Sequence, residues 1–336
     1  MDEVRRIADA VLYEGYILWP YRRSAIKNRQ RWTFGGVYPD AHAAARGGDD
    51  SSSLGTQCLL EAGPDTAVDV TLRFLQVVER QVLADGPGGL RAVDELEVGD
   101  QRHLTWEEAV EREIGRPGLR VADLDMRSRA EIRIPADSRR EPLADAEGRV
   151  VGALERSWRT LEGTLEVAAE PVAGGVVRLS IRVSNTSPYA GRAREEALRQ
   201  TFCSSHLVLR ASGGQFVSMT DPPAELAEAA AACQNVGTWP VLVGPDGDRG
   251  TVLCSPIILP DHPRVAPESP GDLFDATEID QLLVLNILSL TDEEKREMRD
   301  SDPRAREILE RTESLSEQEL MRLHGAIREF GMTRSR

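Results

Sequence analysis

The sequence predicts an α+β protein whose body is an antiparallel, β-rich sandwich or curled sheet. Apolar and polar residues alternate along residues 68–78, which is the period of a half-buried strand. Two further alternating runs, 163–170 and 176–183, flank Gly174-Gly175, a spacing that predicts a hairpin. Helix-capping patterns follow one another after residue 290, so the C-terminal segment is predicted to be helical. At 336 residues and 40% hydrophobic, the chain is long enough to bury a substantial core.

The N-terminal region, 1–53, is predicted to contain a short helix over 2–18, limited by Gly15 and Pro20. An aromatic strap, residues 13–39, follows. It holds seven aromatic side chains in a chain that is 5% aromatic, and five basic residues lie between positions 22 and 31 without an acid. Residues 42–53, rich in Ala, Gly, Asp and Ser, are predicted to form an exposed loop.

The aromatic strap has three interpretations. Its aromatics can pack into the body while its arginines pair with acids of the same chain. It can instead be a docking surface, because Tyr, Trp and Arg dominate the energetics of protein interfaces. A catalytic or ligand-binding role is the third. The partner-binding candidates are Trp19, Tyr21, Arg22, Arg23, Arg29, Arg31 and Trp32.

The middle region, 54–271, is predicted to be the β-rich body. Its strand candidates are 58–61, 68–78, 130–134, 149–158, 161–168, 176–185, 206–211 and 215–219, followed by a hairpin of 239–243 with 251–259. Residues 106–114 are predicted to form a short amphipathic helix capped by Thr105. A second, alanine-rich helix is expected to follow Asp221-Pro222-Pro223 and to end near Cys233.

The C-terminal region, 272–336, is predicted to be a helical segment. Residues 278–290 are apolar on most faces and are expected to pack on the β body. Thr291 and Glu294 have the spacing of a capping box, and Ser301 and Ser316 are expected to begin further helices. Because these last helices are highly charged, we expect them at the edge of the body with little burial.

Composition limits the class of protein. A net charge of −15 argues against general nucleic-acid binding, which needs a basic face. No apolar run reaches the roughly 20 residues of a membrane helix, and the first residues lack a signal-peptide pattern. The four cysteines are widely spaced and form no Cys-x-x-Cys pair. We therefore expect a cytoplasmic protein with reduced thiols and without a bound metal or cofactor.

Two groups of residues could support chemistry. Cys203 and His206 could ligate a metal or act as nucleophile and base, although in a regular strand they would point to opposite faces. Cys254 occupies an apolar strand, where a free cysteine is commonly a small core residue. Asp261-His262 lies between two prolines and close to several acids. This dipeptide is part of a rigid crossing, forms a contact with a ligand or partner, or takes part in catalysis.

Three segments resemble a family of uncharacterised bacterial proteins encoded beside high-affinity [NiFe]-hydrogenases. The segments are ADAVLYEGYILWPYRRSAIKNRQRW at 9–32, WPVLVG with SPIILPDHPRVAPESPGDLFDATEID within 239–280, and LTDEEKREMRDSDPRA at 290–305. The middle of the chain differs most and includes polar insertions at 40–53 and 137–148. The resemblance implies a soluble accessory role in assembling, maturing or scaffolding a hydrogenase. It assigns no catalytic residue.

The leading expectation is therefore a non-catalytic accessory protein whose partner is a protein, namely a [NiFe]-hydrogenase subunit or maturation factor. Two alternatives stay open. The chain could be a metal-binding or thiol-dependent enzyme that uses Cys203, His206, Cys254 and His262, or it could be a structural subunit of a larger assembly.

Overall fold

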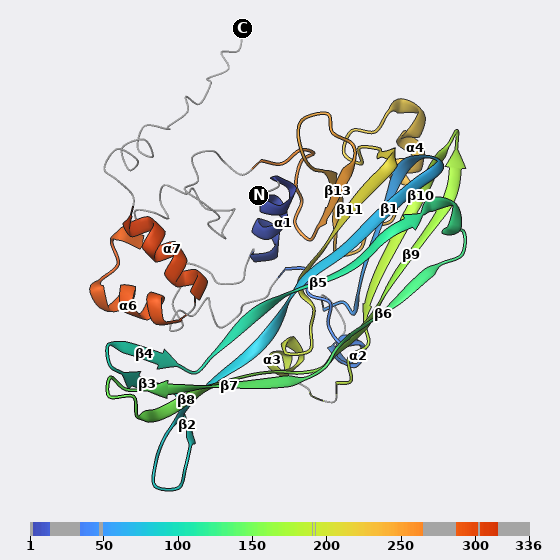
Figure 1. The fold of residues 1–336 in the computed structure, drawn as a ribbon. Helices are drawn as coiled ribbons and strands as arrows, with labels where there is room; N and C mark the ends of the chain where they lie inside the picture. The colour runs from blue at the N-terminus through green and yellow to red at the C-terminus, as the bar shows by residue number, and fades with distance from the viewer. Residues whose placement is uncertain are drawn as a thin grey trace.

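The protein is mostly antiparallel β-sheet with a few helices, which confirms the α+β class. The computed structural model describes residues 3–13, 34–46, 50–189, 191, 193–264, 287–301 and 303–314 (Figure 1). Eleven strands form one sheet, whose main path runs β12-β13-β11-β1-β10-β9-β6, and β3 (Glu95–Val98) pairs with β4 (Gln101–Leu104) in a separate ribbon. Among the helices described, none has the length and apolarity needed to cross a membrane.

Strand β1 (Ser53–Ala84) is the centre of the sheet and is 32 residues long. Its first part pairs with β10 (Val176–Asn185) and its middle with β11 (Cys203–Phe216). Its later part pairs with β5 (Trp106–Arg120), β8 (Val150–Trp158) and β2 (Arg91–Val93). The two strands predicted at 58–61 and 68–78 are therefore one strand, and the residues between them bulge out of the ladder with β11 between Ala62 and Ala67.

The remaining strands extend the sheet on both sides. Strand β9 (Leu161–Ala173) pairs with β10 and with the edge strand β6 (Ser128–Ile134). Strand β13 (Thr251–Ser255) joins β11 to the other edge strand, β12 (Trp239–Leu242). Strand β7 (Asp137–Ala144) pairs with β8. These two strands, with β2, β3 and β4, form what we call the arm, at the lower left of Figure 1. Both predicted hairpins, β9–β10 and β12–β13, are confirmed.

The main hydrophobic core lies against the even-numbered face of β1. Val68, Val70, Leu72 and Phe74 are fully buried there, as the alternating pattern predicts. The ring of Phe74 packs 4.7 Å from that of Phe202, centroid to centroid. Side chains from β9, β10, β11 and the 3-10 turn η2 (Val121–Asp123) complete this core.

Helices cover part of the opposite face of the sheet. Helix α1 (Glu3–Tyr13) packs Val4, Ile7 and Val11 against β11, β12 and β13, and Arg73 of β1 donates a 2.5 Å hydrogen bond to its Asp9. The short helices α2 (Asp40–Arg46), α3 (Arg194–Leu198) and α4 (Ala227–Ala231), the last preceded by η3 (Ala224–Leu226), lie in the connections. Helix η3–α4 confirms the predicted alanine-rich helix.

The two C-terminal helices are more deeply packed than the sequence predicts. Thr291 and Glu294 form the expected capping box at the start of α6 (Asp292–Ser301), with backbone-to-side-chain hydrogen bonds of 2.9 and 3.2 Å. Met298 of α6 and Leu309 of α7 (Pro303–Glu313) are fully buried, in one cluster with Leu75 and Val77 of β1. The expectation of little burial is wrong, because a few apolar residues among many charges are enough to cover this part of the sheet.

Two further predictions are wrong. Residues 106–114, predicted to be helical, belong to β5 and pair with β1 over their whole length. Part of the predicted loop 42–53 is helix α2. Other predictions fall outside the described residues. They include most of the aromatic strap, residues 265–271 of the crossing that contains Asp261-His262, most of the predicted helix 278–290, and the helix expected after Ser316.

Candidate docking surface

Both ends of the aromatic strap are held on the folded body. The partner-binding candidates Trp19, Tyr21, Arg22, Arg23, Arg29, Arg31 and Trp32 lie outside the described residues. At the first end, Tyr13 is buried and its hydroxyl donates a 2.6 Å hydrogen bond to Glu111. At the second end, the carbonyl of Phe34 accepts a hydrogen bond from the Ser204 amide at 3.2 Å. A reciprocal bridge between Val37 and Phe202 continues this pairing.

An aromatic hollow of about 360 Å³ opens at the second end of the strap. Phe34 and Trp239 line it and are 39% and 42% exposed, unusually high for such large apolar side chains. Tyr38 forms a buried wall, and Arg194 donates a 2.6 Å hydrogen bond to its hydroxyl. Burial raises the pKa of Tyr38, so it stays a neutral phenol. The hollow therefore presents aromatic surface beside a fixed guanidinium.

Gly35 and Gly36 line the aromatic hollow and let the backbone pack closely against its walls. Gly35 has φ +57°, and a Cβ on it would lie 2.9 Å from the Cβ of Pro256. A Cβ on Gly36 would lie 2.9 Å from the ring of Tyr38. Any side chain at either position would displace a wall of the hollow, because neither proline nor the buried tyrosine can move aside cheaply.

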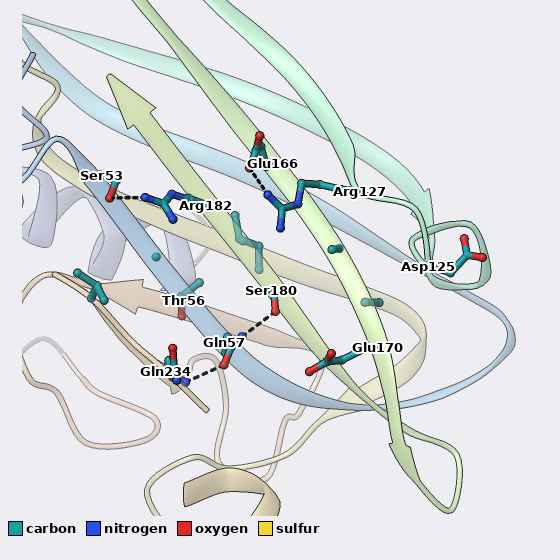
Figure 2. A pocket seen from close by; sticks show the side chains of 15 residues that line it. Ser53, Thr56, Gln57, Asp125, Arg127, Glu166, Glu170, Ser180, Arg182 and Gln234 are labelled. Carbon is teal, nitrogen blue, oxygen red and sulfur yellow. Dashed lines mark hydrogen bonds and ion pairs between the residues drawn. The ribbon is translucent and has the colours of Figure 1, made fainter. Parts of the chain in front are cut away.

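A polar hollow of about 490 Å³ lies on the outer face of β1, β10 and β9 (Figure 2). The register aligns Gln57 with Ser180 and Ala168, and Gly55 with Arg182 and Glu166. Gly55, Ser180 and Ala168 thus lie beside the longer side chains of Gln57, Arg182 and Glu166. This difference in length leaves the polar hollow open.

Hydrogen bonds and ion pairs fix the walls of the polar hollow. Gln57 donates to Ser180 at 3.0 Å, and Arg127 pairs with Glu166 at 3.0 Å. Arg182 donates to Ser53 at 3.3 Å, as Figure 2 shows. Both hydrogen-bond donors and acceptors therefore line the polar hollow.

The two hollows form one continuous surface, which we call the docking face. Ser53 lines both of them, and residues 236–239 pass from one to the other. A reciprocal backbone bridge between Gly55 and Val236, with hydrogen bonds of 3.0 and 2.8 Å, holds this segment against β1. Of seven large hydrophobic residues exposed in the described chain, Phe34, Val236 and Trp239 lie on this face.

The predicted Cys203–His206 pair is buried and differs from the expected geometry. A register shift places Cys203 opposite Leu75 and His206 opposite Arg73, two residues on the same face of β1. The expectation of opposite faces is wrong, because Ser204, with φ +52°, lies where the ladder shifts register. His206 is 0% exposed, and burial lowers its pKa to about 3. Its imidazole is therefore neutral near pH 7.

The other chemical candidates are also engaged in the fold. Burial raises the pKa of the Cys254 thiol to about 12, so it is a protonated core residue. Among the described residues, no group of three or more His, Cys, Asp or Glu side chains is arranged to hold a metal ion.

Asp261 and His262 form an edge clamp on β12. The Asp261 carboxylate accepts hydrogen bonds from Ser218 (2.5 Å), Thr220 (2.7 Å) and the Leu242 amide (2.8 Å). The amide of His262, which has φ +52°, donates a 2.7 Å hydrogen bond to the Leu242 carbonyl. These contacts satisfy the amide and the carbonyl of Leu242 in this edge strand, and both groups would otherwise be free to pair with another chain. The Asp261 carboxylate and the His262 backbone thus have structural contacts, and a ligand or partner contact of this dipeptide stays a prediction.

Comparison with known proteins gives no match, so the function has to be inferred from the geometry. No model of a known protein family matches the chain, and no curated protein is significantly similar to it. The sequence analysis placed Phe34 and Tyr38 in the aromatic strap but did not name them among the partner-binding candidates. For the rest of the docking face the sequence offers only a weak signal. Trp239 begins a predicted strand, and the sequence alone does not show whether a tryptophan at that position is exposed or buried.

Proposed function

We propose that this chain is a non-catalytic accessory protein that binds a protein partner through the docking face, and that the partner is a subunit or maturation factor of a [NiFe]-hydrogenase. The observation that carries the proposal is the gathering of Phe34, Val236 and Trp239, all exposed, on one hollowed surface. The hydrogenase context rests on the three sequence segments that resemble proteins encoded beside such enzymes.

The composition of the docking face supports binding of a protein. Interfaces combine a central aromatic group with a polar rim, and tryptophan and arginine are the residues whose loss is most costly. Trp239 and Phe34 supply the apolar centre, while Arg182 and Arg194 lie at its sides. Because Arg194 is already oriented by Tyr38, it loses little conformational freedom on binding.

The state of the candidate reactive groups also supports a non-catalytic role. Nucleophilic cysteine requires an accessible thiolate, whereas Cys254 is buried and protonated and Cys203 is buried in an apolar cluster. A general base must reach its substrate, and His206 is enclosed by the sheet.

The proposal is tested by copurification of the tagged chain from its native host, followed by identification of the bound proteins and by binding measurements with the purified partner. The variant Trp239→Ala removes the largest apolar group of the docking face. Leu90→Ala is the matched control, since Leu90 is 41% exposed, almost as much as Trp239, but lies at the far end of the arm.

We expect a hydrogenase component to be recovered with the wild type and with Leu90→Ala. Recovery should fall strongly with Trp239→Ala, because an interface tryptophan typically contributes about 2 kcal/mol or more, roughly thirtyfold in affinity. Recovery of no hydrogenase component would reject the partner assignment. Equal binding by Trp239→Ala and Leu90→Ala would reject the docking face.

A further inference from the structure

Trp158, the last residue of β8, has two arginines against its indole ring. The Cζ atom of Arg112, on β5, lies 5.6 Å from the ring centroid, and that of Arg139, on β7, lies at 5.5 Å. The indole Nε1 donates a 3.1 Å hydrogen bond to the Pro135 carbonyl, which fixes the ring. Strands β5 and β8 both pair with β1, and β7 pairs with β8 (Figure 1).

The guanidinium of Arg112 is held in place from below. Its Nε donates a 2.9 Å hydrogen bond to Oε1 of Gln76, a fully buried residue of β1. The amide nitrogen of Gln76 in turn donates a 2.8 Å hydrogen bond to the Arg159 carbonyl. This chain of contacts uses only the Nε of Arg112. Its terminal nitrogens have no hydrogen-bond or ion-pair partner within the described part of the chain.

The described carboxylates near Trp158 do not pair with the two arginines. Asp137, which lies opposite Trp158 in the β7–β8 ladder, accepts a 2.8 Å hydrogen bond from the Ser138 amide. Arg156 lies opposite Arg139 in the β7–β8 ladder and donates to Glu108 at 2.8 Å and to Glu141 at 3.2 Å. No described carboxylate forms an ion pair with Arg112 or with Arg139. Two guanidinium groups thus lie against one indole ring without an ion-pair partner among the described residues, in a chain of net charge −15.

The two guanidinium groups also act on each other. Burial, and after it the positive charge of Arg139, lowers the pKa of Arg112. Arg112 nevertheless remains charged near pH 7, since the guanidinium group deprotonates only at very high pH. Like charges brought together in a partly buried place repel each other, and a bound anion removes this repulsion.

We propose that Arg112 and Arg139, which both lie against the indole ring of Trp158, form a binding site for a small oxyanion of the phosphate class. Arginine presents planar pairs of N–H donors that match phosphate oxygens, and a dianion neutralises both charges. The buried support from Gln76 fixes one guanidinium before the ligand arrives, so little freedom is lost on binding. The site lies in the arm and is independent of the docking face.

Titration of the purified full chain with inorganic phosphate tests the site. Binding is followed by calorimetry and by tryptophan fluorescence, and sodium chloride at matched ionic strength corrects for screening. The variants are Arg112→Gln and Arg139→Gln. Arg91→Gln is the matched control, because Arg91 is an exposed arginine of the same arm on β2 and has no carboxylate partner among the described residues.

We expect saturable binding by the wild type and by Arg91→Gln. Each of the other variants should bind about tenfold more weakly or worse, because each loses charge-assisted hydrogen bonds to the anion. The circular dichroism spectrum of every variant distinguishes a folding defect from a binding defect. Arg139 is on the exposed edge strand, so its replacement should leave the fold intact.

Three outcomes would overturn the proposal. The first is no saturable heat or fluorescence change up to about 10 mM phosphate, the range of weak small-ligand affinities. The second is an equal affinity in the wild type and in both arginine variants. The third is tighter binding of succinate than of phosphate, which would reject the phosphate class.

Discussion

Replacing Leu309 by alanine should destabilise the whole protein and not only helix α7. Leu309 is fully buried among Met298 of α6, Leu12 of α1, and Leu75 and Val77 of β1. The substitution removes apolar atoms from a place where three separate elements meet. Such a place cannot collapse to fill the space without moving β1, which has partners along nearly all of its length.

The expected cost is about 3 kcal/mol. Substitutions of buried leucine by alanine cost about 2–5 kcal/mol, through the lost transfer of the side chain and the cavity that remains. Because single domains are commonly stable by only about 5–15 kcal/mol, this loss is large enough to measure directly.

Urea denaturation followed by tryptophan fluorescence measures the effect, and hydrogen exchange locates it. The matched control is Glu310→Ala on the same helix, since Glu310 is exposed and lacks an ion pair among the described residues. Its unfolding free energy should stay within about 0.5 kcal/mol of the wild type, as is usual for surface substitutions.

A loss of less than about 1 kcal/mol for Leu309→Ala would refute the reasoning, since the cluster would then tolerate the cavity. Faster exchange confined to α6 and α7, with an unchanged fluorescence transition, would also refute it. The helices would then open on their own, as an edge segment with little burial would do.

Two further variants test polar side chains that contact the fold, one buried and one half-buried. The folded state lowers the pKa of His206 to about 3, below its usual value of about 6.5. The unfolded chain therefore binds more protons between these pH values, and stability should fall as the pH is lowered through this window. His206→Gln should flatten that slope between pH 7 and pH 5 in urea denaturation, and an unaltered slope would contradict the assignment. Asp261→Ala should cost about 2–3 kcal/mol by removing a carboxylate with three hydrogen bonds, and should increase light scattering by uncovering the edge of β12. Asp246→Ala, which removes an exposed carboxylate, is its control, and equal midpoints for the two variants would reject the clamp.

Local signals in the sequence predicted the elements that depend on local chemistry. Gly174 and Gly175 adopt the positive φ angles that the predicted β9–β10 turn requires. Thr291 and Glu294 form their capping box through contacts within four residues. Each of these features needs no partner from elsewhere in the chain, so a short window contains all the information.

Strand β5 shows where local signals fail. Trp106, Ala109 and Val110 have helical spacing, and Thr105 resembles a helix cap. In the structure Thr105 instead accepts a hydrogen bond from the Val82 amide and donates one to the Val93 carbonyl. Pairing with the long central strand outweighs a weak helical preference, and that pairing partner lies about 30 residues away.

The candidate site was less predictable than the fold because register creates it. The polar hollow exists because Gly55, Ala168 and Ser180 from three strands lie between longer side chains, and no single stretch shows this. In the same way, the register shift at Ser204 placed Cys203 and His206 on one face, which strand periodicity alone predicted wrongly.

The length of β1 has a consequence for how the chain is made. The first and middle parts of β1 pair with residues far away in the sequence, since Ser53 lies opposite Ser184 and Leu75 opposite Cys203. Its later residues pair closer in sequence, with β2 and β5. On a ribosome, the arm can therefore form first, while the other partners of β1 are still to be synthesised.

During that interval the nascent chain exposes an apolar strand with an unpaired edge. At typical rates of synthesis, the wait from the end of β1 to the end of β11 is on the order of ten seconds. An open edge of this kind can pair with other chains and aggregate. We therefore expect the yield of soluble protein to depend on translation speed, temperature and chaperone supply during synthesis, even where the finished molecule is stable.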